Sequence, residues 1–247
     1  MCTIVIAWRQ FDDVPIAVAA NRDEATDRPS TGPALREGEP RVLAPRDERA
    51  GGTWMGVNEH GLFAIVANRW TDADLAGERS RGLLTGDVLA SESVASATAL
   101  LRAETADREY EGFTMVVADG SEARVVEWDG TVADRSLSPG VHVVVNVGVD
   151  GEYDVPTHRW EIGERQARNA DRIREAVEPT SSEGVEQWLD RASDVLADHD
   201  YGACIHQDRY GTVSSSQVAV GADGAVDWLY ADGPPCTTAF RRVDGQI

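Results

Sequence analysis

The sequence predicts an α+β domain in which helices cover two β-sheets. About ten short, apolar, β-branched segments are bounded by Gly, Pro, Asp or Asn, as strands commonly are. That number is too large for one simple open sheet, so we expect two. The segments with helical periodicity gather between blocks of strands and do not alternate with them, which favours α+β over α/β.

The expected elements follow from these patterns in chain order. The strands are 2–8, 15–20, 53–57, 62–67, 113–118, 124–128, 141–145, 203–206, 213–220 and 226–230. The helices are 82–104, 157–177 and 183–197. The stretch 27–50 is rich in Pro, Gly and Arg and predicts a long irregular loop. With 247 residues and no repeat or convincing linker, we expect residues 1–247 to form a single domain.

The charge of the chain is strongly negative. There are 43 acidic and 23 basic residues, all 23 of them Arg, which gives a net charge of −20. Such a surface repels phosphate backbones and anionic lipids, so we expect no nucleic acid partner. Abundant carboxylates without Lys fit a cytoplasm of molar salt, where the Debye length falls to about 3 Å. We therefore predict a halophilic source. An ordinary acidic mesophilic protein is the alternative, and the absence of Lys disfavours it.

The N-terminus and the cysteines indicate where the protein works and whether it forms disulfides or binds metal. The apolar run 2–8 is too short for a signal peptide or a membrane span, so we expect a cytoplasmic protein without membrane insertion. Cys2, Cys204 and Cys236 form no CxxC pair and predict free thiols. The histidines show no paired ligand spacing, and Cys204 with His206 offers only two ligands. We therefore expect no metal site and no cofactor.

Cys2 is the first candidate catalytic residue. Methionine aminopeptidases remove Met1 when the next residue is small, which would leave a cysteine that carries both a thiol and a free α-amine. A thiol with a pKa near 8.5 and an amine with a pKa near 7.7 can act as nucleophile and base. The alternative is that Cys2 packs as a small hydrophobic residue at the start of an apolar strand.

The end of the second strand supplies charged partners for Cys2. Strand 15–20 runs directly into Asn21, Arg22 and Asp23. In an antiparallel hairpin, the start of the first strand lies beside the end of the second, which places Cys2 near these residues. Asp23 could hold the α-ammonium, and Arg22 could lower the thiol pKa or polarise a substrate carbonyl. A solvated turn with a capping Asp is the alternative.

Three ordered motifs carry a family resemblance. They are MCTI at 1–4, NRDE at 21–24 and AGGTWMGVNEHGLFAIVANR at 50–69, with weaker echoes at 145–147 and 210–215. Together they resemble the NRDE family, also called the transport and Golgi organisation 2 family. The same blocks are more distantly similar to the cysteine-type N-terminal nucleophile acylases, such as the bile-salt and penicillin V acylases.

The resemblance implies a four-layer αββα sandwich of the N-terminal nucleophile hydrolase type. Carried over by position, Cys2 matches the nucleophile and Asp23 the acid that anchors its amine. Asn68 matches an oxyanion-hole donor, and Asn146 matches a second amide in the site. For both asparagines, a turn residue is the alternative. Ala20 stands where the acylases have an arginine, so Arg22 need not take that arginine's role.

Neighbouring residues suggest a substrate pocket. Trp54 could line an apolar acyl pocket, although a Trp is more often core or rim. A thiolate in so negative a protein needs positive charge nearby, which makes Arg22 and Arg69 candidates. Gly52 would let the backbone approach a ligand closely, or it marks a tight turn into the next strand.

These residues support a leading hypothesis and two alternatives. The leading one is cysteine-dependent hydrolysis or acyl transfer at the C–N bond of a small, partly apolar amide. Cys2 attacks, its α-amine is the base, Asp23 orients that amine, and Asn68 with Asn146 holds the oxyanion. The first alternative is a non-enzymatic carrier or trafficking protein, because family members are linked to haem or lipid handling and a Cys thiolate can ligate haem iron. The second is a structural or chaperone-like subunit with a buried Cys2. Substrate identity and oligomeric state stay open.

Overall fold

The computed structural model describes residues 2–245 and 247, and this part of the chain folds into two antiparallel sheets with helices outside them. The strands are β1 (Thr3–Phe11), β2 (Val14–Ala25), β3 (Ser30–Arg36), β4 (Val42–Asp47), β5 (Met55–Asn58), β6 (Phe63–Asn68), β7 (Phe113–Ala118), β8 (Ala123–Trp128), β9 (Val132–Ser136), β10 (Gly140–Val145), β11 (Gly148–Val149), β12 (Glu152–Tyr153), β13 (Tyr210–Val220), β14 (Val226–Ala231) and β15 (Arg241–Arg242). The helices are α1 (Arg81–Leu89), α2 (Val94–Asp107), α3 (Trp160–Ala176) and α4 (Val185–Ala197), with short 3-10 turns η1 (Thr157–Arg159) and η2 (His199–Tyr201).

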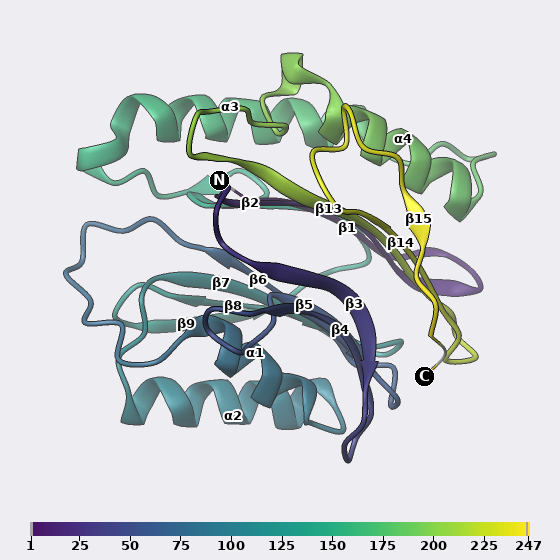
Figure 1. The fold of residues 1–247 in the computed structure, drawn as a ribbon, viewed down its shortest axis with the longest axis horizontal. Helices are drawn as coiled ribbons and strands as arrows, with labels where there is room; N and C mark the ends of the chain where they lie inside the picture. The colour runs from purple at the N-terminus through teal and green to yellow at the C-terminus, as the bar shows by residue number, and fades with distance from the viewer. Residues whose placement is uncertain (1, 246) are drawn as a thin grey trace.

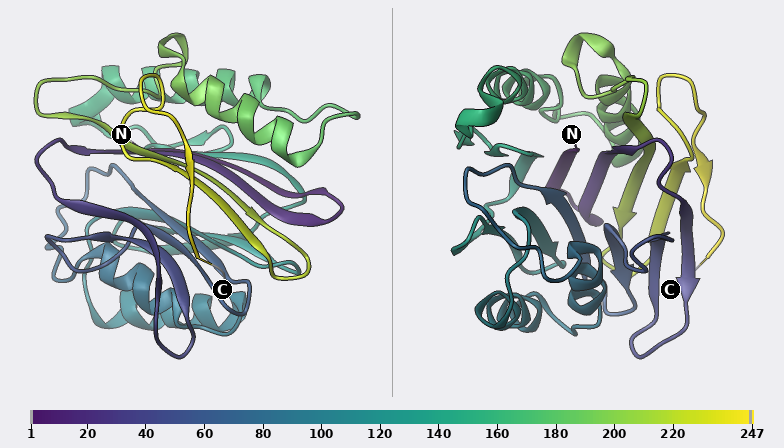
Figure 2. Two further views of the ribbon diagram at one scale, coloured as in Figure 1. Left: turned by 45° about the vertical axis from the view of Figure 1, so that its right-hand side comes forward. Right: turned by 60° about the vertical axis from the view of Figure 1, so that its left-hand side comes forward.

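The layers follow the order helix, sheet, sheet, helix (Figure 1). The first sheet has the strand order β12-β11-β10-β1-β2-β13-β14-β15 and is covered by α3 and α4. The second has the order β3-β4-β5-β6-β7-β8-β9 and is covered by α1 and α2. The rotated views in Figure 2 show the same arrangement, with both helix pairs on the outside. The predicted α+β sandwich of two sheets is confirmed.

The central strands are apolar on both faces because both faces are covered. Side chains alternate along β1, so Ile4 and Ile6 pack between the sheets, whereas Val5 and Ala7 pack against the outer helices. The neighbouring strand β2 divides in the same way. This alternation explains why these strands read as continuous apolar runs. It also fixes which side of β1 faces the space between the sheets.

The expected loop at 27–50 is wrong, because this stretch contains β3 and β4. Pro and Gly are tolerated there because β3 is an edge strand. The register between β3 and β4 shifts between Thr31 and Ala34, which places Gly32 and Pro33 in a bulge. A composition typical of loops thus reflects an irregular edge strand.

The expected single helix at 82–104 is two helices. α1 ends at Leu89, and α2 begins after Ser93, whose side chain forms a capping box with Ser96. The Asn58 side chain caps the end of α1, because its amide donates to the carbonyls of Leu89 at 2.9 Å and Ser91 at 2.7 Å. The helical periodicity of the sequence continues across this break, but the capping residues determine where α1 ends and α2 begins.

The expected strand at 203–206 is also wrong. Only an isolated bridge between His206 and Gly211 forms there. The short strands β11, β12 and β15 and the exposed, polar β9 carry too few apolar residues to be predicted.

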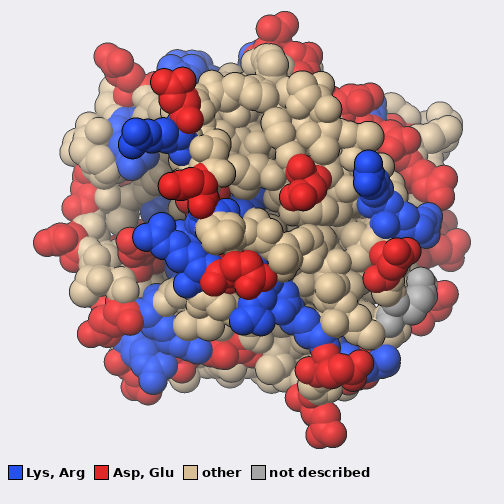
Figure 3. All heavy atoms as spheres, viewed as in Figure 1, with Lys and Arg blue, Asp and Glu red and all other residues tan. Residues whose placement is uncertain are grey.

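The surface reflects the composition. Acidic side chains border most of the face in Figure 3, and arginines gather in a band across its middle. In the part of the chain that the structure covers, no helix combines the length and apolarity needed to cross a bilayer.

Candidate active site

A cavity of about 360 Å³ lies where β1 begins and β2 and β6 end. Its walls also include the residues before β5 and the start of α1. Part of the lining is apolar: Ile4, Ala20, Trp54, Met55, Ile65 and Val66. Most of the rest is polar or charged and includes the arginines Arg22, Arg28, Arg79 and Arg81 and the carboxylates Asp23, Glu24, Asp47 and Glu111. The cavity therefore offers an apolar patch beside a strongly polar wall.

Cys2 lies beside Asn21 to Asp23, as the hairpin predicts, but the expected end of this strand at residue 20 is wrong, because β2 continues to Ala25 through its pairing with β13. Thr3 pairs with Asn21, and the Cys2 thiol is 3.8 Å from the main-chain oxygen of Asp23. Burial raises the pKa of the Cys2 thiol, and the charge of Arg22 opposes that shift. The thiol therefore holds its proton at neutral pH unless a base is close. Met1, whose removal we expect, lies outside the described residues.

Asn146, at the end of β10, holds the main-chain nitrogen of Cys2. Its side-chain oxygen accepts from that nitrogen at 3.1 Å and from the Gln166 amide at 3.0 Å. Its own amide donates to the Asn68 main-chain oxygen at 2.7 Å. Asn146 is only 1% exposed. In this arrangement Asn146 positions Cys2 and the end of β6, which differs from the expected role as an oxyanion donor.

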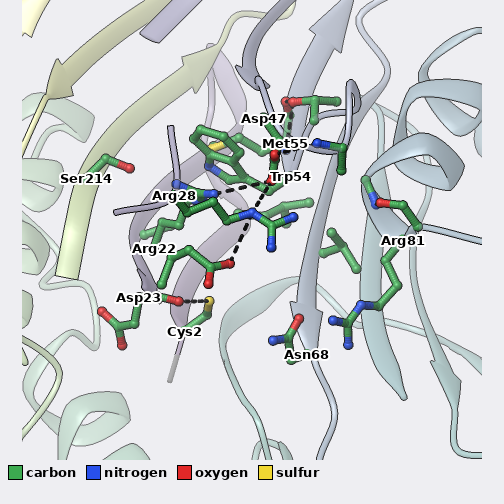
Figure 4. A pocket seen from close by; sticks show the side chains of 18 of the residues that line it. Cys2, Arg22, Asp23, Arg28, Asp47, Trp54, Met55, Asn68, Arg81 and Ser214 are labelled. Carbon is green, nitrogen blue, oxygen red and sulfur yellow. Dashed lines mark hydrogen bonds and ion pairs between the residues drawn. The ribbon is translucent and has the colours of Figure 1, made fainter. Parts of the chain in front are cut away.

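The Asn68 side chain faces the cavity that Cys2 borders. It lies at the end of β6, lines the cavity with Cys2, and points into the same space (Figure 4). Its amide makes no hydrogen bond with any residue that the structure describes, so its donors are available to a ligand. The oxyanion role expected for Asn68 stays a prediction, and the geometry is compatible with it.

Asp23 is buried next to Cys2. Thr212, its partner on β13, donates its hydroxyl to the Asp23 carboxylate at 2.6 Å. The Tyr210 hydroxyl donates to the Asp23 main-chain oxygen at 3.2 Å. Burial raises the pKa of the Asp23 carboxyl to about 6, although the Thr212 hydrogen bond opposes the shift. A carboxyl so placed can bind a cation when it is ionised.

Arg22 and Trp54 form one side of the cavity. The Arg22 guanidinium stacks 4.0 Å from the Trp54 ring centroid. It also pairs with Asp47 at 3.5 Å and donates to the Ser30 hydroxyl at 3.3 Å. Arg28 binds the same Asp47 carboxylate at 2.7 Å. Arg22 is thus fixed beside the cavity and paired with Asp47, and the roles expected for it stay predictions.

The expected substrate contact from Arg69 is not what the structure shows. Its guanidinium binds Glu127 at 2.6 Å, and Arg69 is absent from the described residues that line the cavity. Successive residues at a strand end point to opposite sides, so Asn68 faces the cavity and Arg69 does not. Arg81, at the start of α1, lines the cavity instead and is held by Gly112 and Glu111 at 2.8 Å each.

Gly52, just before β5, allows close packing of two main-chain segments. A Cβ on Gly52 would lie 2.2 Å from the main chain of Gly82, and the Thr53 nitrogen donates to the Gly82 oxygen at 3.0 Å. Gly52 therefore lets the start of α1 approach the chain just before β5. The close approach that Gly52 permits is to the main chain of α1, a partner that neither interpretation of this glycine named.

Three residues of the site were not singled out from the sequence. Thr212 lies in the weak motif at 210–215, which contributes to the family resemblance but does not by itself indicate what Thr212 does. Gln166 and Arg81 lie on helices far along the chain, and nothing in the local sequence connects them with Cys2. Their contacts depend on the packing of layers.

Solved structures similar to this chain include an acylase, a bile acid hydrolase and an acid amidase. The mutant C2A of conjugated bile acid hydrolase from Clostridium perfringens has a TM-score of 0.58 and 12% identity, covering 99% of this chain and 97% of that one. An N-acylethanolamine-hydrolyzing acid amidase ortholog from Caenorhabditis elegans has a TM-score of 0.58 and 13% identity, covering 87% and 92%. Penicillin V acylase from Agrobacterium tumefaciens has a TM-score of 0.50 and 15% identity, covering 98% of each chain. At such identities the likeness concerns the fold, and it confirms the αββα sandwich of the N-terminal nucleophile hydrolase type.

Sequence comparisons point to one family. The family model described as "Transport and Golgi organisation 2" matches residues 1–230. The Transport and Golgi organization 2 homolog of Mus musculus is 29% identical over 161 residues, which is 59% of this chain and 57% of the mouse protein. The Bos taurus homolog gives the same identity and coverage. The match thus spans little more than half the length of these relatives.

Proposed function

Because the chain belongs to the Transport and Golgi organisation 2 family and has the fold of the cysteine acylases, we propose that it hydrolyses or transfers the acyl group of a small, partly apolar amide. Cys2, freed at its nitrogen by removal of Met1, is the nucleophile. The observation that carries the proposal is that Asn146 holds the Cys2 nitrogen at 3.1 Å while the thiol borders a cavity.

The electrostatics of the site favour the α-amine of Cys2 as the base. Burial raises the pKa of the thiol, so a thiolate forms only if a base takes its proton. Among the described residues that line the cavity there is no histidine. An α-amine with a pKa near 7.7 is poised to accept the proton, and it belongs to the same residue.

In the proposed reaction, the neutral amine takes the thiol proton as the sulfur attacks the substrate carbonyl carbon. The Asn68 amide donates to the oxyanion of the tetrahedral intermediate. The C–N bond then breaks, and the amine returns its proton to the leaving nitrogen. Water or an acceptor amine resolves the thioester. Asp23 holds the ammonium that forms during the attack, and Asn146 keeps the nitrogen in place.

The cavity indicates the size of the substrate. Its volume of about 360 Å³ lies near the lower end of the range for pockets that hold drug-sized ligands. The apolar wall that includes Trp54 suits a short acyl chain or an aromatic acyl group. A short acyl amide therefore fits better than a long-chain lipid.

The proposal is tested with the purified full chain. We expect the intact mass to lack Met1, and a panel of acyl p-nitroanilides of increasing chain length to release p-nitroaniline, with short chains preferred. Cys2→Ala keeps a small second residue, so Met1 is still removed, but the thiol is lost and activity should disappear. A variant with one glutamate inserted between Met1 and Cys2 keeps the thiol without the free amine, and we expect it to be inactive.

Two results would overturn the proposal. One is a wild-type chain that retains Met1. The other is a Cys2 thiol that iodoacetamide alkylates no faster than an unstructured cysteine peptide. A Soret shift on haemin titration that depends on Cys2, without hydrolysis of any amide, would instead favour the carrier hypothesis.

A further inference from the structure

Four nitrogen and sulfur ligands gather beside the candidate active site. His199 lies in η2, Cys204 and His206 follow it, and Cys236 comes from the segment after β14. One potential ligand atom from each residue lies within 4.8 Å of the other three. The Cys204 sulfur is 3.5 Å from the Cys236 sulfur and 3.5 Å from His206 Nε2, which is 3.2 Å from the Cys236 sulfur.

The separations among the ligand atoms of Cys204, His206 and Cys236 are close to the edges of a tetrahedral zinc site, and the His199 nitrogen lies within 4.8 Å of each of them. Zinc binds sulfur at about 2.3 Å and histidine nitrogen at about 2.0 to 2.1 Å, which gives ligand-to-ligand edges of about 3.3 to 3.8 Å. The separations among Cys204, His206 and Cys236 lie at or just below this range. Two sulfurs with two imidazole nitrogens form a ligand set typical of zinc.

The chain geometry brings Cys204 and His206 to the same side. Gly202 has a φ of 66° at the end of η2, a left-handed conformation that glycine adopts readily. Thr212 holds Ile205 in place through two hydrogen bonds of 2.9 Å. The Thr212 nitrogen donates to the Ile205 oxygen, and the Thr212 hydroxyl accepts from the Ile205 nitrogen. With Ile205 held in this way, the Cys204 sulfur and His206 Nε2 lie 3.5 Å apart.

Cys236 lies 32 residues after Cys204, in the segment that follows β14. It lies in a turn in which the nitrogens of Thr237 and Thr238 donate to the Pro234 oxygen at 3.1 and 2.9 Å. The structure has Cys204 and Cys236 as free thiols. Thiol hydrogen bonds are weak, so they offset little of the cost of ordering four side chains, two of them exposed histidines. A shared metal ion accounts for the convergence better.

The expectation of no metal site rested on sequence spacing, because the four residues span positions 199 to 236 and Cys236 lies 30 residues after His206. From their geometry, we propose that His199, Cys204, His206 and Cys236 bind one Zn²⁺ in a closed, structural site. Four protein ligands leave no open position for a substrate. Binding releases the two thiol protons and ties the segment after β14 to the loop after η2.

The site would also support Asp23 without taking part in chemistry. Thr212, which holds Ile205 between the two ligands Cys204 and His206, donates a hydrogen bond from its hydroxyl to the Asp23 carboxylate at 2.6 Å. The Asn21 amide donates to the Ala203 oxygen at 3.0 Å, which joins the same loop to β2. The zinc proposal does not depend on the proposed amidohydrolase activity.

The test uses metal content and cobalt spectroscopy on the full chain in high salt. Elemental analysis after chelator treatment and reloading with ZnCl₂ should give about one zinc per chain. Cys236→Ser and His206→Gln should lower bound zinc at least about tenfold. His158→Gln, an exposed histidine outside the cluster, and Cys2→Ser are matched controls that should keep it.

The spectrum of bound Co²⁺ distinguishes this site from adventitious binding to the acidic surface. The experiment uses the wild-type chain, so it does not depend on whether a variant folds. Co²⁺ added to the metal-free wild type should produce the intense visible bands and the thiolate charge-transfer band of tetrahedral sulfur coordination, whereas carboxylate-bound Co²⁺ is octahedral and pale. Absence of these bands, zinc retained by Cys236→Ser, or a zinc-free wild type two hydrogens lighter through a Cys204–Cys236 disulfide would overturn the proposal.

Discussion

The side-chain oxygen of Asn146 accepts a hydrogen bond from the main-chain nitrogen of Cys2 at 3.1 Å. The same amide group is bound to Gln166 of α3 and to the main chain of Asn68. One side chain therefore joins the proposed nucleophile, the outer helix layer and the end of β6. The position of the Cys2 nitrogen is fixed from outside β1, which is what an α-amine acting as a base requires.

Asn146→Ala should slow alkylation of the Cys2 thiol and lower amide turnover by roughly 10². The reason is that the nitrogen beside the thiol loses its acceptor and its orientation. Unfolding should also become easier by about 1 to 3 kcal/mol, because the Gln166 amide is left without its partner in a buried site. Alkylation rates come from peptide mass mapping, and stability from urea denaturation.

Asn58→Ala is the matched control for this variant. Asn58 is also 1% exposed, and it caps α1 through two hydrogen bonds away from Cys2. It should cost similar stability and leave the alkylation rate of Cys2 unchanged. Equal slowing in both variants would mean that Asn146 acts only through general stability.

Asn68→Ala should lower kcat by about 10² to 10³ and change KM little, because the oxyanion exists only in the transition state. The Asn68 side chain is exposed and makes no hydrogen bond within residues 2–245 and 247, so the urea midpoint should stay within error of the wild type. Steady-state kinetics on the best p-nitroanilide measure the effect. A rise in KM with kcat unchanged would assign Asn68 to ground-state binding.

The sequence predicted the layers and the first partners of Cys2, but not the supporting contacts. Alternating apolar strands and a hairpin are local features, so the neighbourhood of Cys2 and Asp23 follows from the pairing of β1 with β2. The bond from Gln166 to Asn146 depends on how α3 lies on the first sheet, which no local pattern encodes. The outward direction of Arg69 depends on where β6 ends, and strand ends are poorly defined by composition.

The four-ligand cluster shows the same limit more sharply. Cys204 and His206 are adjacent enough in sequence to be considered together, but two ligands do not make a site. His199 joins them through the turn at Gly202, and Cys236 joins them because β14 runs antiparallel to β13. Spacing along the chain is a reliable guide to metal sites only when the ligands share one local element.

Asp23 should make the protein less stable as the pH rises from about 4 to 6. Its pKa is raised to about 6 from 3.8, so the folded state keeps a proton that the unfolded state has lost. This contribution is fully present below the unfolded pKa and is lost as the pH rises through about 6. A shift of about two units corresponds to about 3 kcal/mol.

Asp23→Asn isolates this effect, because an Asn oxygen can still accept from Thr212 and does not titrate. Urea denaturation of both proteins between pH 3.5 and 7 should give a stability difference that moves in favour of the variant as the pH rises. The other carboxylates titrate in both proteins and cancel. Two parallel profiles would show that Asp23 has an ordinary pKa.

The stability of the protein should depend strongly on salt concentration. If the source is halophilic, as the composition predicts, the acidic surface is adapted to molar salt, which screens its charges. With a net charge of −20, lowering the ionic strength from 1 M to 0.01 M lengthens the Debye length from about 3 to about 30 Å and exposes acidic groups to one another. The melting temperature should therefore fall steeply on dialysis from molar KCl. Asp12→Asn with Asp13→Asn, two exposed residues of the β1–β2 turn, should reduce that dependence, and sucrose in place of KCl should not restore stability to the same extent. A cooperative melt that is unchanged in low salt would count against the halophilic source and leave the acidic surface as a feature of solubility alone.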